Sequence, residues 1–484
     1  MEFYIKTNRI FTPLRQYVWL FIFLVAVGGL WYPKLGLLMI PIMLTLMILG
    51  MLKGKYWCGN ICPHGSFFDG IIMPVSRNIS LPAWLKHKVT IFLMFAWFMY
   101  MLGSRLAKVI SLWGTTPFID KLGYIFVTNY LVVTILGTIL ALTIAPRAWC
   151  RICPMGTMQI LFYKLGNLLK INHKTDAKVT IANKDMCHIC GKCARVCPMQ
   201  LTPYLEFNDD NQLDNNHCIK CQTCVKNCPA GILSLKPREE ALFIKETMTA
   251  KINTKPAEIT AQITDIKELN KDTREYTFKL LNPTTISFQA GQFILVKIQD
   301  YPVMYRAYSI SYYHKGILKI IVKKVPKGYG TGIIFNKFQV GDKVLLRGPM
   351  GEAMVLKNPA AQKLLFVAGG IGITPFLAMV EEALAKGADH IKLIHGVRNK
   401  NELIYKSYFD ELTRNYAHFE YIPVVSDDDK EWKGKKGLVT DIMRELDLNE
   451  YKIYMCGSPA MIEAGLNLLS EAGIEKENIY YETA

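Results

Sequence analysis

The amino-acid sequence predicts a chain of four structural parts. These are a bundle of four transmembrane helices, a small cysteine-rich domain, an antiparallel β-barrel and an α/β domain with a parallel sheet. Apolar stretches of membrane length are confined to residues 1–175. Two closely spaced cysteine runs follow them. After residue 255, short alternating strands give way to strands that alternate with helices.

Four charge-free apolar stretches are bounded by basic residues. Each is near the roughly 17–25 residues that a helix needs to cross a bilayer. The basic residues that bound the shortest stretch can extend toward the lipid surface. Four buried helices of a soluble protein are the alternative, which the number and length of the stretches disfavour. The stretches lie between Arg15 and Lys34, Lys34 and Lys53, Lys88 and Arg105, and Lys121 and Arg147.

The positive charge of the chain is concentrated beside these stretches. The chain has 484 residues and a net charge of +17, and residues 1–175 contain 17 Lys and Arg against three acidic residues. Basic residues gather before the first stretch, after the second and after the fourth, which the positive-inside rule places in the cytoplasm. We therefore expect a multi-pass protein of the cytoplasmic membrane with no nucleic-acid partner. Both termini and all later domains should be cytoplasmic.

Two cysteine runs of identical spacing define the second part, residues 176–236. Each reads Cys-x2-Cys-x2-Cys-x3-Cys-Pro, the pattern of bacterial two-cluster ferredoxins, in which the fourth cysteine of each run binds the other cluster. Zinc is the alternative, which two complete runs ending in Cys-Pro disfavour. The expected [4Fe–4S] ligands are Cys187, Cys190, Cys193 and Cys228 for one cluster, and Cys218, Cys221, Cys224 and Cys197 for the second.

Four further cysteines belong to an internal repeat. After the second and fourth apolar stretches, a basic residue and a Trp precede a cysteine pair that ends in Pro. Because two similar pairs of spans should pack with their ends together, we expect a third iron–sulfur cluster at the cytoplasmic membrane surface. Reduced structural cysteines are the alternative. The expected ligands are Cys58, Cys62, Cys150 and Cys153.

Residues 10–230 resemble the membrane polyferredoxin subunits of nitrate and nitrous-oxide reductase systems. The resemblance rests on the apolar stretches, the repeated cysteine pairs and the two ferredoxin runs. Those subunits use C-x3-C-P pairs, whereas the second pair here is C-x2-C-P, which leaves the type of the third cluster open.

A charged linker is expected over residues 237–254, followed by a β-barrel over residues 255–357. The barrel prediction rests on alternating apolar residues. The strands expected from this alternation are Ile259–Ile266, Glu275–Leu280 and Phe293–Ile298.

The run Arg306-Ala-Tyr308-Ser309 suits a flavin. Tyr308 can stack on the flavin ring, Arg306 can bind its phosphates, and Ser309 can hydrogen-bond near the reactive nitrogen. Four residues alone would equally fit an ordinary strand. Downstream, Gly328-Tyr-Gly330-Thr331 is expected to form a flexible turn whose backbone N–H groups can face phosphate.

The last part, residues 358–484, opens with an apolar strand and the turn Gly369-Gly370-Ile-Gly372-Ile-Thr374-Pro375. Such a turn lets a pyrophosphate approach the backbone at a helix N-terminus. Two further strands, Ile391–Val397 and Phe419–Val425, alternate with helices, as a parallel sheet requires. Cys456 ends another strand, where a buried core thiol would be the ordinary interpretation.

In this order the motifs resemble the ferredoxin–NADP reductase family over residues 255–484. The resemblance implies bound FAD, in preference to FMN, and makes Ser309 and Cys456 the expected catalytic residues. Many members end in an aromatic residue that covers the flavin, whereas Tyr481 is followed here by three more residues. The resemblance assigns the flavin to Arg306, Tyr308 and Ser309, its phosphates to Gly330 and Thr331, the nucleotide to Gly369, Gly370, Gly372 and Thr374, and the nicotinamide to Cys456.

The acidic run Asp427-Asp428-Asp429 bears on nucleotide choice. NADP-preferring relatives place basic residues here for the 2′-phosphate, which a carboxylate would repel. An acid such as Asp427 can instead accept a hydrogen bond from a ribose hydroxyl. A solvated acidic loop is the alternative. We expect NADH as the cofactor.

These parts predict a membrane-bound oxidoreductase. Hydride from NADH carries two electrons and each cluster carries one, so flavin must link them. The expected acceptor is a quinone or a partner membrane redox protein. A membrane-anchored ferredoxin:NAD⁺ oxidoreductase and an electron-donor subunit of a larger redox complex remain alternatives. Because the four stretches contain no Asp, Glu, Lys, Arg or His, we do not expect the chain itself to pump ions.

Overall fold

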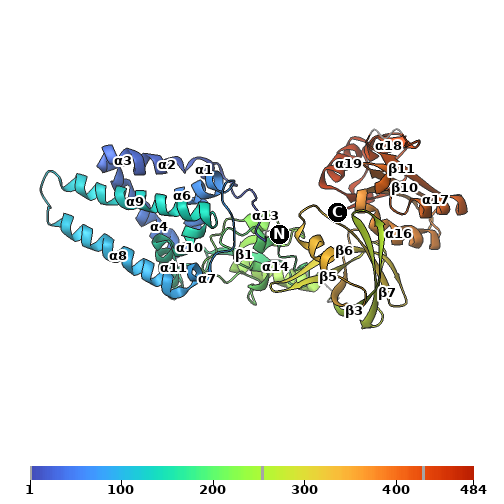
Figure 1. Cartoon of the computed structure of the whole chain (residues 1–484), viewed down its shortest axis with the longest axis horizontal. Helices are drawn as coiled ribbons and strands as arrows, with labels where there is room; N and C mark the ends of the chain where they lie inside the picture. Colours follow the sequence, from blue (N-terminus) through green and yellow to red (C-terminus); the bar gives the residue numbers. More distant parts are fainter. Residues whose placement is uncertain (1–2, 252–255, 428–430, 484) are drawn as a thin grey trace. The chain divides into compact units, whose positions relative to one another are not determined.

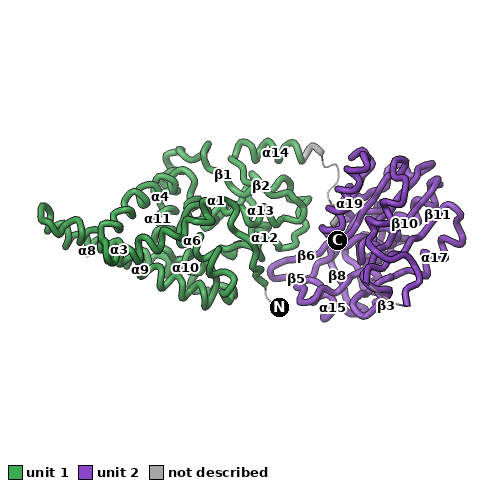
Figure 2. Tube along the Cα trace, turned by 90° about the horizontal axis from the view of Figure 1, so that it is seen from above, with its two compact units in different colours: residues 1–254 green, residues 255–484 purple. Residues whose placement is uncertain are grey.

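The computed structural model describes residues 3–251, 256–427 and 431–483. The chain divides into two compact units, residues 1–254 and 255–484 (Figure 2). Each unit has its own hydrophobic core, and Figure 1 labels many of the elements of both.

Three helices of the first unit are long and apolar enough to cross a membrane. They are Pro33–Lys53, which includes α4 (Met39–Lys53), α8 (Lys88–Ile110) and α9 (Phe118–Thr143). Large apolar side chains on these helices face outward: Trp97 is 55% exposed and Phe92 is 66% exposed. A continuous apolar exterior of this kind is suited to contact with lipid.

The first of the four predicted spans is shorter than expected. After α1 (Pro13–Tyr17), the apolar helix covers only Leu20–Trp31, through α2 (Leu20–Ile22), a π-helical turn and α3 (Gly28–Trp31). It ends at Tyr32 because Pro33 disfavours the helical conformation of the residue before it. The prediction of four membrane-length helices is therefore supported for three, and the first stretch is corrected to a shorter helix.

Short helices carry the paired cysteines of the first unit. Pro63 and Pro154 each occupy the first position of a helix, where the missing N–H of proline costs no hydrogen bond. The elements after α4 are α5 (Tyr56–Asn60), α6 (Pro63–Phe67) and α7 (Ala83–Lys86), and those after α9 are α10 (Ala148–Ile152) and α11 (Pro154–Leu168).

A small module completes the first unit. Its two strands, β1 (Ala177–Ile181) and β2 (Leu233–Pro237), pair antiparallel and enclose the cysteine runs, which carry the one-turn helices α12 (Lys192–Arg195) and α13 (Thr223–Lys226). Helix α14 (Arg238–Lys251) then occupies most of the segment predicted as a linker. Glu239 and Glu240 lie in its first turn, where the helix dipole favours negative charge.

The second unit begins with a closed antiparallel barrel of order β3-β4-β7-β6-β5-β8. The three strands predicted from alternation lie within β3, β4 and β5. Gly328-Tyr-Gly330-Thr331, expected as a flexible turn, is instead the start of helix α15 (Tyr329–Lys337). The barrel strands are β3 (Ala257–Asn270), β4 (Thr273–Asn282), β5 (Phe293–Asp300), β6 (Val303–His314), β7 (Ile317–Lys323) and β8 (Lys343–Met350).

A six-stranded parallel sheet forms the rest of the second unit. Its order is β12-β11-β10-β9-β13-β14, and apolar clusters cover both faces. The strands are β9 (Lys363–Gly369), β10 (His390–Val397), β11 (Phe419–Val425), β12 (Lys435–Lys436), β13 (Tyr451–Gly457) and β14 (Ile479–Thr483). The helices are α16 (Thr374–Ala385), α17 (Lys406–Asn415), α18 (Val439–Arg444) and α19 (Pro459–Glu471).

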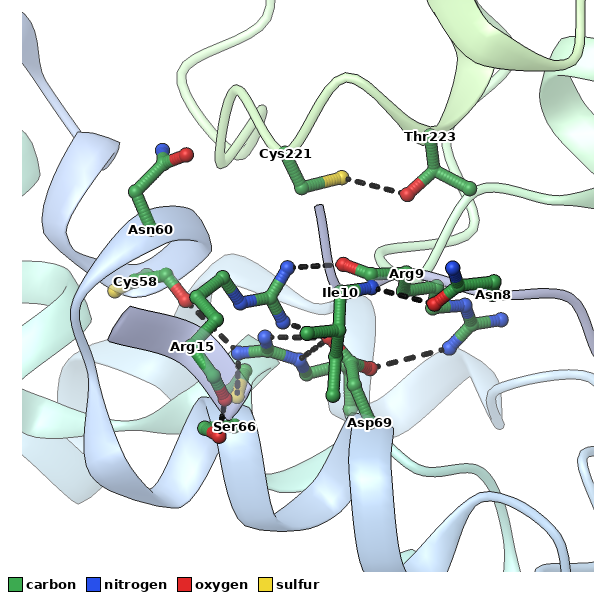
Figure 3. A network of polar contacts seen from close by, with 12 residues as sticks. Asn8, Arg9, Ile10, Arg15, Cys58, Asn60, Ser66, Asp69, Cys221 and Thr223 are labelled. Carbon is green, nitrogen blue, oxygen red and sulfur yellow. Dashed lines mark hydrogen bonds and ion pairs between the residues drawn. The ribbon is translucent and has the colours of Figure 1, made fainter. Parts of the chain in front are cut away.

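A buried charge network joins three separate segments of the first unit (Figure 3). The carboxylate of Asp69 accepts hydrogen bonds from Arg147 at 2.7 Å, from Arg15 at 2.6 Å and from Arg9 at 3.4 Å. All four side chains are almost fully buried. Burial raises the pKa of the Asp69 carboxyl, but the charges of Arg147 and Arg9 outweigh it and hold that pKa well below its ordinary value.

We expect Asp69→Asn to destabilise the protein by about 3–5 kcal/mol, because it leaves buried guanidinium groups without a compensating charge. The measurement is thermal or denaturant unfolding of the purified protein in detergent. Asp120→Asn, an exposed change at the start of α9, is the control and should have little effect. Equal stability of the two variants would contradict the structural importance of the network.

Candidate functional site

The predicted flavin residues of β6 lie beside the start of α15. A Cβ atom added to Gly330 would lie 2.5 Å from Nε of Arg306, so the first turn of α15 packs directly against the guanidinium group. The Thr331 hydroxyl accepts a hydrogen bond from the backbone N–H of Val325 at 3.1 Å. Burial raises the pKa of the Tyr308 hydroxyl above its ordinary value, although Arg306 opposes the shift. A cation beside the N-terminus of a helix fits the phosphates of a flavin nucleotide.

Ser309 lies next along β6 from Tyr308 and pairs with Phe293 of β5 in the barrel. The structure thus brings Arg306, Gly330 and Thr331 together, with Tyr308 and Ser309 on the same strand as Arg306. The arrangement has the cation, aromatic ring and hydroxyl that a flavin requires.

The glycine-rich turn follows β9, and its backbone packs against Cys456. A Cβ atom added to Gly372 would lie 2.1 Å from the carbonyl oxygen of Cys456, so any larger residue would force the two segments apart. Gly370 has a φ of +57°, which favours glycine. The Thr374 hydroxyl donates to the carbonyl of Ile371 at 2.8 Å, closing the turn at the start of α16. This backbone cradle fits a pyrophosphate.

Two residues near this turn were not predicted from the sequence. His395 of β10 is fully buried, and its ring nitrogens contact the carbonyl of Gly370 and the hydroxyl of Tyr421, each at 3.1 Å. Glu482 of β14 lies opposite Cys456 in the sheet register. Burial, and then the charge of Glu482, raise the pKa of the Cys456 thiol to about 12. Only the sheet order brings these residues to the site.

Asp427 lies just after β11, where its backbone N–H donates to the carbonyl of Arg398 at 2.8 Å. Its side chain is exposed. Asp428 and Asp429, the rest of the predicted acidic run, lie outside the described residues.

The ferredoxin cysteines gather in two groups. Cys187, Cys190, Cys193 and Cys228 line one small cavity of about 20 Å³, which brings the fourth cysteine of the second run to the first run. In the other group, Cys197 interacts with Cys218 and Cys221, and burial raises the pKa of the Cys197 thiol to about 12. Cys224 interacts with these three thiols and also with Cys193 of the first group. The structure thus places the fourth cysteine of each run beside the cysteines of the other run.

The four cysteines of the internal repeat also converge. We call them the membrane cysteines, because each pair follows a helix of membrane length. Cys58, Cys62, Cys150 and Cys153 line a single cavity of about 120 Å³. Burial, and then the charges of Cys58 and Cys150, raise the pKa of the Cys153 thiol to about 12. Four neighbouring thiols cannot all ionise in an apolar site without cations among them, which the irons of a cluster would supply.

The described residues contain no group of three His, Cys, Asp or Glu side chains close enough to hold a single metal ion. In a four-iron cluster each thiolate binds a different iron atom, so its ligands lie farther apart than the ligands of one ion. Four thiolates placed around a cluster therefore need not form such a group.

The two repeats exchange their basic residues. Lys55 of the first repeat donates to the carbonyl of Cys150 in the second at 3.3 Å, and Arg147 of the second donates to the carbonyl of Cys58 in the first at 3.0 Å. Cys62 and Cys153 have nearly identical backbone angles before their prolines, with φ of −59° and −58°. The cysteine site is thus built with approximate twofold symmetry.

Glycines make room for the exchanged cations. A Cβ atom on Gly65 would lie 2.4 Å from a guanidinium nitrogen of Arg147, and one on Gly156 would lie 3.1 Å from Nζ of Lys55. The backbone amides of Gly65 and Gly156 also hydrogen-bond the thiols of Cys62 and Cys153. These N–H groups belong to first helical turns, which leave donors free for an anion.

The second ferredoxin run packs directly on the first membrane cysteine loop. A Cβ atom on Gly59 would lie 1.9 Å from the carbonyl oxygen of Ile219, and the Asn60 side chain donates to the carbonyl of Lys220 at 3.4 Å. Cys58, Cys150, Cys218 and Cys221 contribute to one apolar cluster with Ile219. The second ferredoxin site and the membrane cysteine site are therefore neighbours within the first unit.

Four parts of the chain match known protein families. Residues 260–354 match the oxidoreductase FAD-binding domain, and residues 366–465 match the oxidoreductase NAD-binding domain. Residues 186–233 match a 4Fe-4S dicluster domain, and residues 35–82 with 128–172 match a 4Fe-4S binding domain.

Curated proteins resemble the chain over about half of its length. The electron transfer component of toluate 1,2-dioxygenase from Pseudomonas putida is 31% identical over 235 residues, which are 47% of this chain and 68% of that protein. The phenol 2-monooxygenase reductase component DmpP from Pseudomonas sp. is 32% identical over 40% of this chain, which spans 57% of that protein. Among solved structures, the cytochrome P450 reductase GcoB of Amycolatopsis matches 48% of this chain and 72% of its own, with 26% identity and a TM-score of 0.45.

The domain matches agree with the separate sites described above. The barrel and the parallel sheet correspond to the FAD-binding and NAD-binding domains, and the cysteine runs correspond to 4Fe-4S domains. The chain therefore belongs to the ferredoxin reductase family, as an NAD(P)H-dependent flavin and iron–sulfur electron-transfer reductase.

Proposed function

We propose that this reductase is anchored in the cytoplasmic membrane and passes electrons from NADH to an acceptor in that membrane. The observation that carries the proposal is the convergence of Cys58, Cys62, Cys150 and Cys153 beside membrane-length helices and against the second ferredoxin site. An iron–sulfur site in that position would link a soluble reductase to the lipid phase.

The proposed cluster ligands follow the three cysteine groups. Flavin, when bound, accepts hydride and releases electrons singly, which matches a two-electron donor to one-electron clusters. Of the two ferredoxin clusters, the one held next to the membrane cysteines would be the last to receive electrons. We assign the first ferredoxin cluster to Cys187, Cys190, Cys193 and Cys228, the second to Cys197, Cys218, Cys221 and Cys224, and a third to Cys58, Cys62, Cys150 and Cys153.

Residues of the second unit bind and orient the two nucleotides. We propose that Arg306, Tyr308, Ser309, Gly330 and Thr331 hold FAD and that Gly369, Gly370, Gly372 and Thr374 hold the pyrophosphate of NADH. His395 fixes the carbonyl of Gly370 and so acts as a positioning residue. Ser309 and Cys456 are the proposed catalytic residues, at the flavin and the nicotinamide.

A second candidate function is that of an electron-donor component for a partner metalloenzyme. Curated relatives carry names such as electron transfer component of toluate 1,2-dioxygenase, which favours this alternative. The two candidates differ in the acceptor, so acceptor specificity of the purified protein in lipid distinguishes them.

We expect Cys150→Ser to remove one cluster. Iron and sulfide should fall from about twelve to about eight per flavin, because each cluster contributes four of each. Delivery to the membrane acceptor should be lost, while NADH-driven reduction of a soluble dye continues from the flavin. Cys456→Ser, outside the three cysteine groups, is the control and should retain the iron. Unchanged iron content in Cys150→Ser would refute the third cluster.

We expect Gly59→Ala to separate the second ferredoxin site from the membrane cysteine loop, because the new methyl group has no room beside Ile219. Such overpacking costs about 1–3 kcal/mol of stability and should slow reduction of the membrane cluster in freeze-quench spectroscopy. Gly103→Ala is the matched control, since the space around Gly103 is open. Identical reduction rates in both variants would argue against this contact as the electron route.

We expect NADH to reduce the flavin in preference to NADPH, and Asp427→Asn to narrow that preference about two- to threefold. The change is small because an exposed charge contributes about 0.5 kcal/mol at physiological salt. The preference is measured as the ratio of the rates of flavin reduction by NADH and by NADPH in stopped-flow experiments. Asp389→Asn is the control. Asp389 is exposed and precedes β10, at the amino ends of the parallel strands, whereas Asp427 follows the carboxyl end of β11. Equal rates with NADH and NADPH in the unmutated protein would contradict NADH preference.

A further inference from the structure

The cavity at the membrane cysteines is larger than the cavity at the first ferredoxin site. Four cysteines of the first ferredoxin site surround about 20 Å³, whereas the membrane cysteines lie at one side of about 120 Å³. The larger cavity is not confined to its cysteines, because it also reaches side chains of the three membrane-length helices. A ligand held by these helices would therefore lie beside the cysteines.

Apolar side chains from the three membrane-length helices line this cavity. Met39, Phe98 and Phe126 are only half-buried, so the lining of the cavity is not closed off from the apolar exterior of these helices, from which a ligand soluble in lipid would enter. The lining residues include Met39, Ile42 and Met43 of α4, Phe98 of α8, and Phe126 and Val133 of α9.

One buried hydroxyl in this lining has no hydrogen-bond partner. Tyr130 of α9 is 8% exposed, and its hydroxyl makes no hydrogen bond to the residues that the structure describes. The Tyr130 ring packs 4.5 Å from the ring of His64, which is fixed by a 2.9 Å hydrogen bond to Thr134. A buried hydroxyl without a partner is costly, so this geometry favours a ligand that accepts a hydrogen bond there.

We propose that this cavity binds the head group of a membrane quinone, with the Tyr130 hydroxyl donating to one quinone carbonyl. A quinone is lipid-soluble, has a flat six-membered ring, accepts hydrogen bonds at its carbonyls and exchanges electrons with clusters. Ligand pockets of this kind combine an apolar lining with a few polar groups. The inference rests on the proposed function and names its acceptor.

The electrons and protons balance for the reduction of one quinone to quinol by one NADH. NADH supplies two electrons and one proton as it becomes NAD⁺, and water supplies a second proton. Quinone takes up both electrons and both protons and becomes quinol. Clusters held by the three cysteine groups would carry the two electrons one at a time and would be regenerated unchanged.

The test is equilibrium binding of decylubiquinone to the full-length holoprotein in lipid nanodiscs. The unmutated protein should bind it, and Tyr130→Phe should bind it roughly fivefold more weakly, the effect of one lost neutral hydrogen bond. Val133→Phe, which fills the cavity, should abolish binding. Tyr124→Phe is the matched control on the same helix, because Tyr124 faces outward, and its affinity should be unchanged.

Three results would overturn the inference: no quinone binding by the unmutated holoprotein, equal binding by Tyr130→Phe and Tyr124→Phe, or full binding by Val133→Phe. Flavin and cluster reduction by NADH is measured on the same samples. Reduction without quinone binding overturns the quinone site and leaves a protein acceptor for the proposed function. Tyr130-dependent binding without reduction of the membrane cluster supports the site and contradicts the proposed function.

Discussion

The buried carboxylate of Asp69 among three guanidinium groups determines how the membrane-side cysteines are held. It joins the N-terminal arm, through Arg9 and Arg15, to the segment after α6 and to Arg147, which reaches the backbone of Cys58. The network contains three guanidinium groups and one carboxylate, and Arg147 also donates to the thiol of Cys150. Excess buried positive charge favours thiolates, and therefore the anionic cluster that we propose there.

Patterns within short segments of the sequence predicted the elements whose formation depends on neighbouring residues. The cysteine runs, three of the six barrel strands and the glycine-rich turn with its flanking strand and helix were recognisable, because spacing, alternation and backbone freedom act over a few residues. The first span was overestimated because charge-free length does not reveal the helix end before Pro33. The role of Gly328 at a helix start was missed because glycine is equally common in turns.

Site residues that depend on distant contacts could not be predicted. His395 and Glu482 reach their positions through the order of strands in the parallel sheet, and nothing beside them in sequence marks them. Arg9 and Arg15 were predicted only as topology signals, although they are buried partners of Asp69. The cavity at Tyr130 is enclosed by three separate helices, so no single segment carries its pattern.

The exchange of Lys55 and Arg147 between the repeats has a consequence for how this site could arise. Neither repeat completes its own surroundings: each lends its cation to the cysteine loop of the other, and each keeps a glycine to receive the other's cation. A half-length ancestor with one repeat could build the same site only as a symmetric pair of chains. Within one chain the two halves need not be identical, and their cysteine pairs indeed differ in spacing, with three residues between Cys58 and Cys62 and two between Cys150 and Cys153.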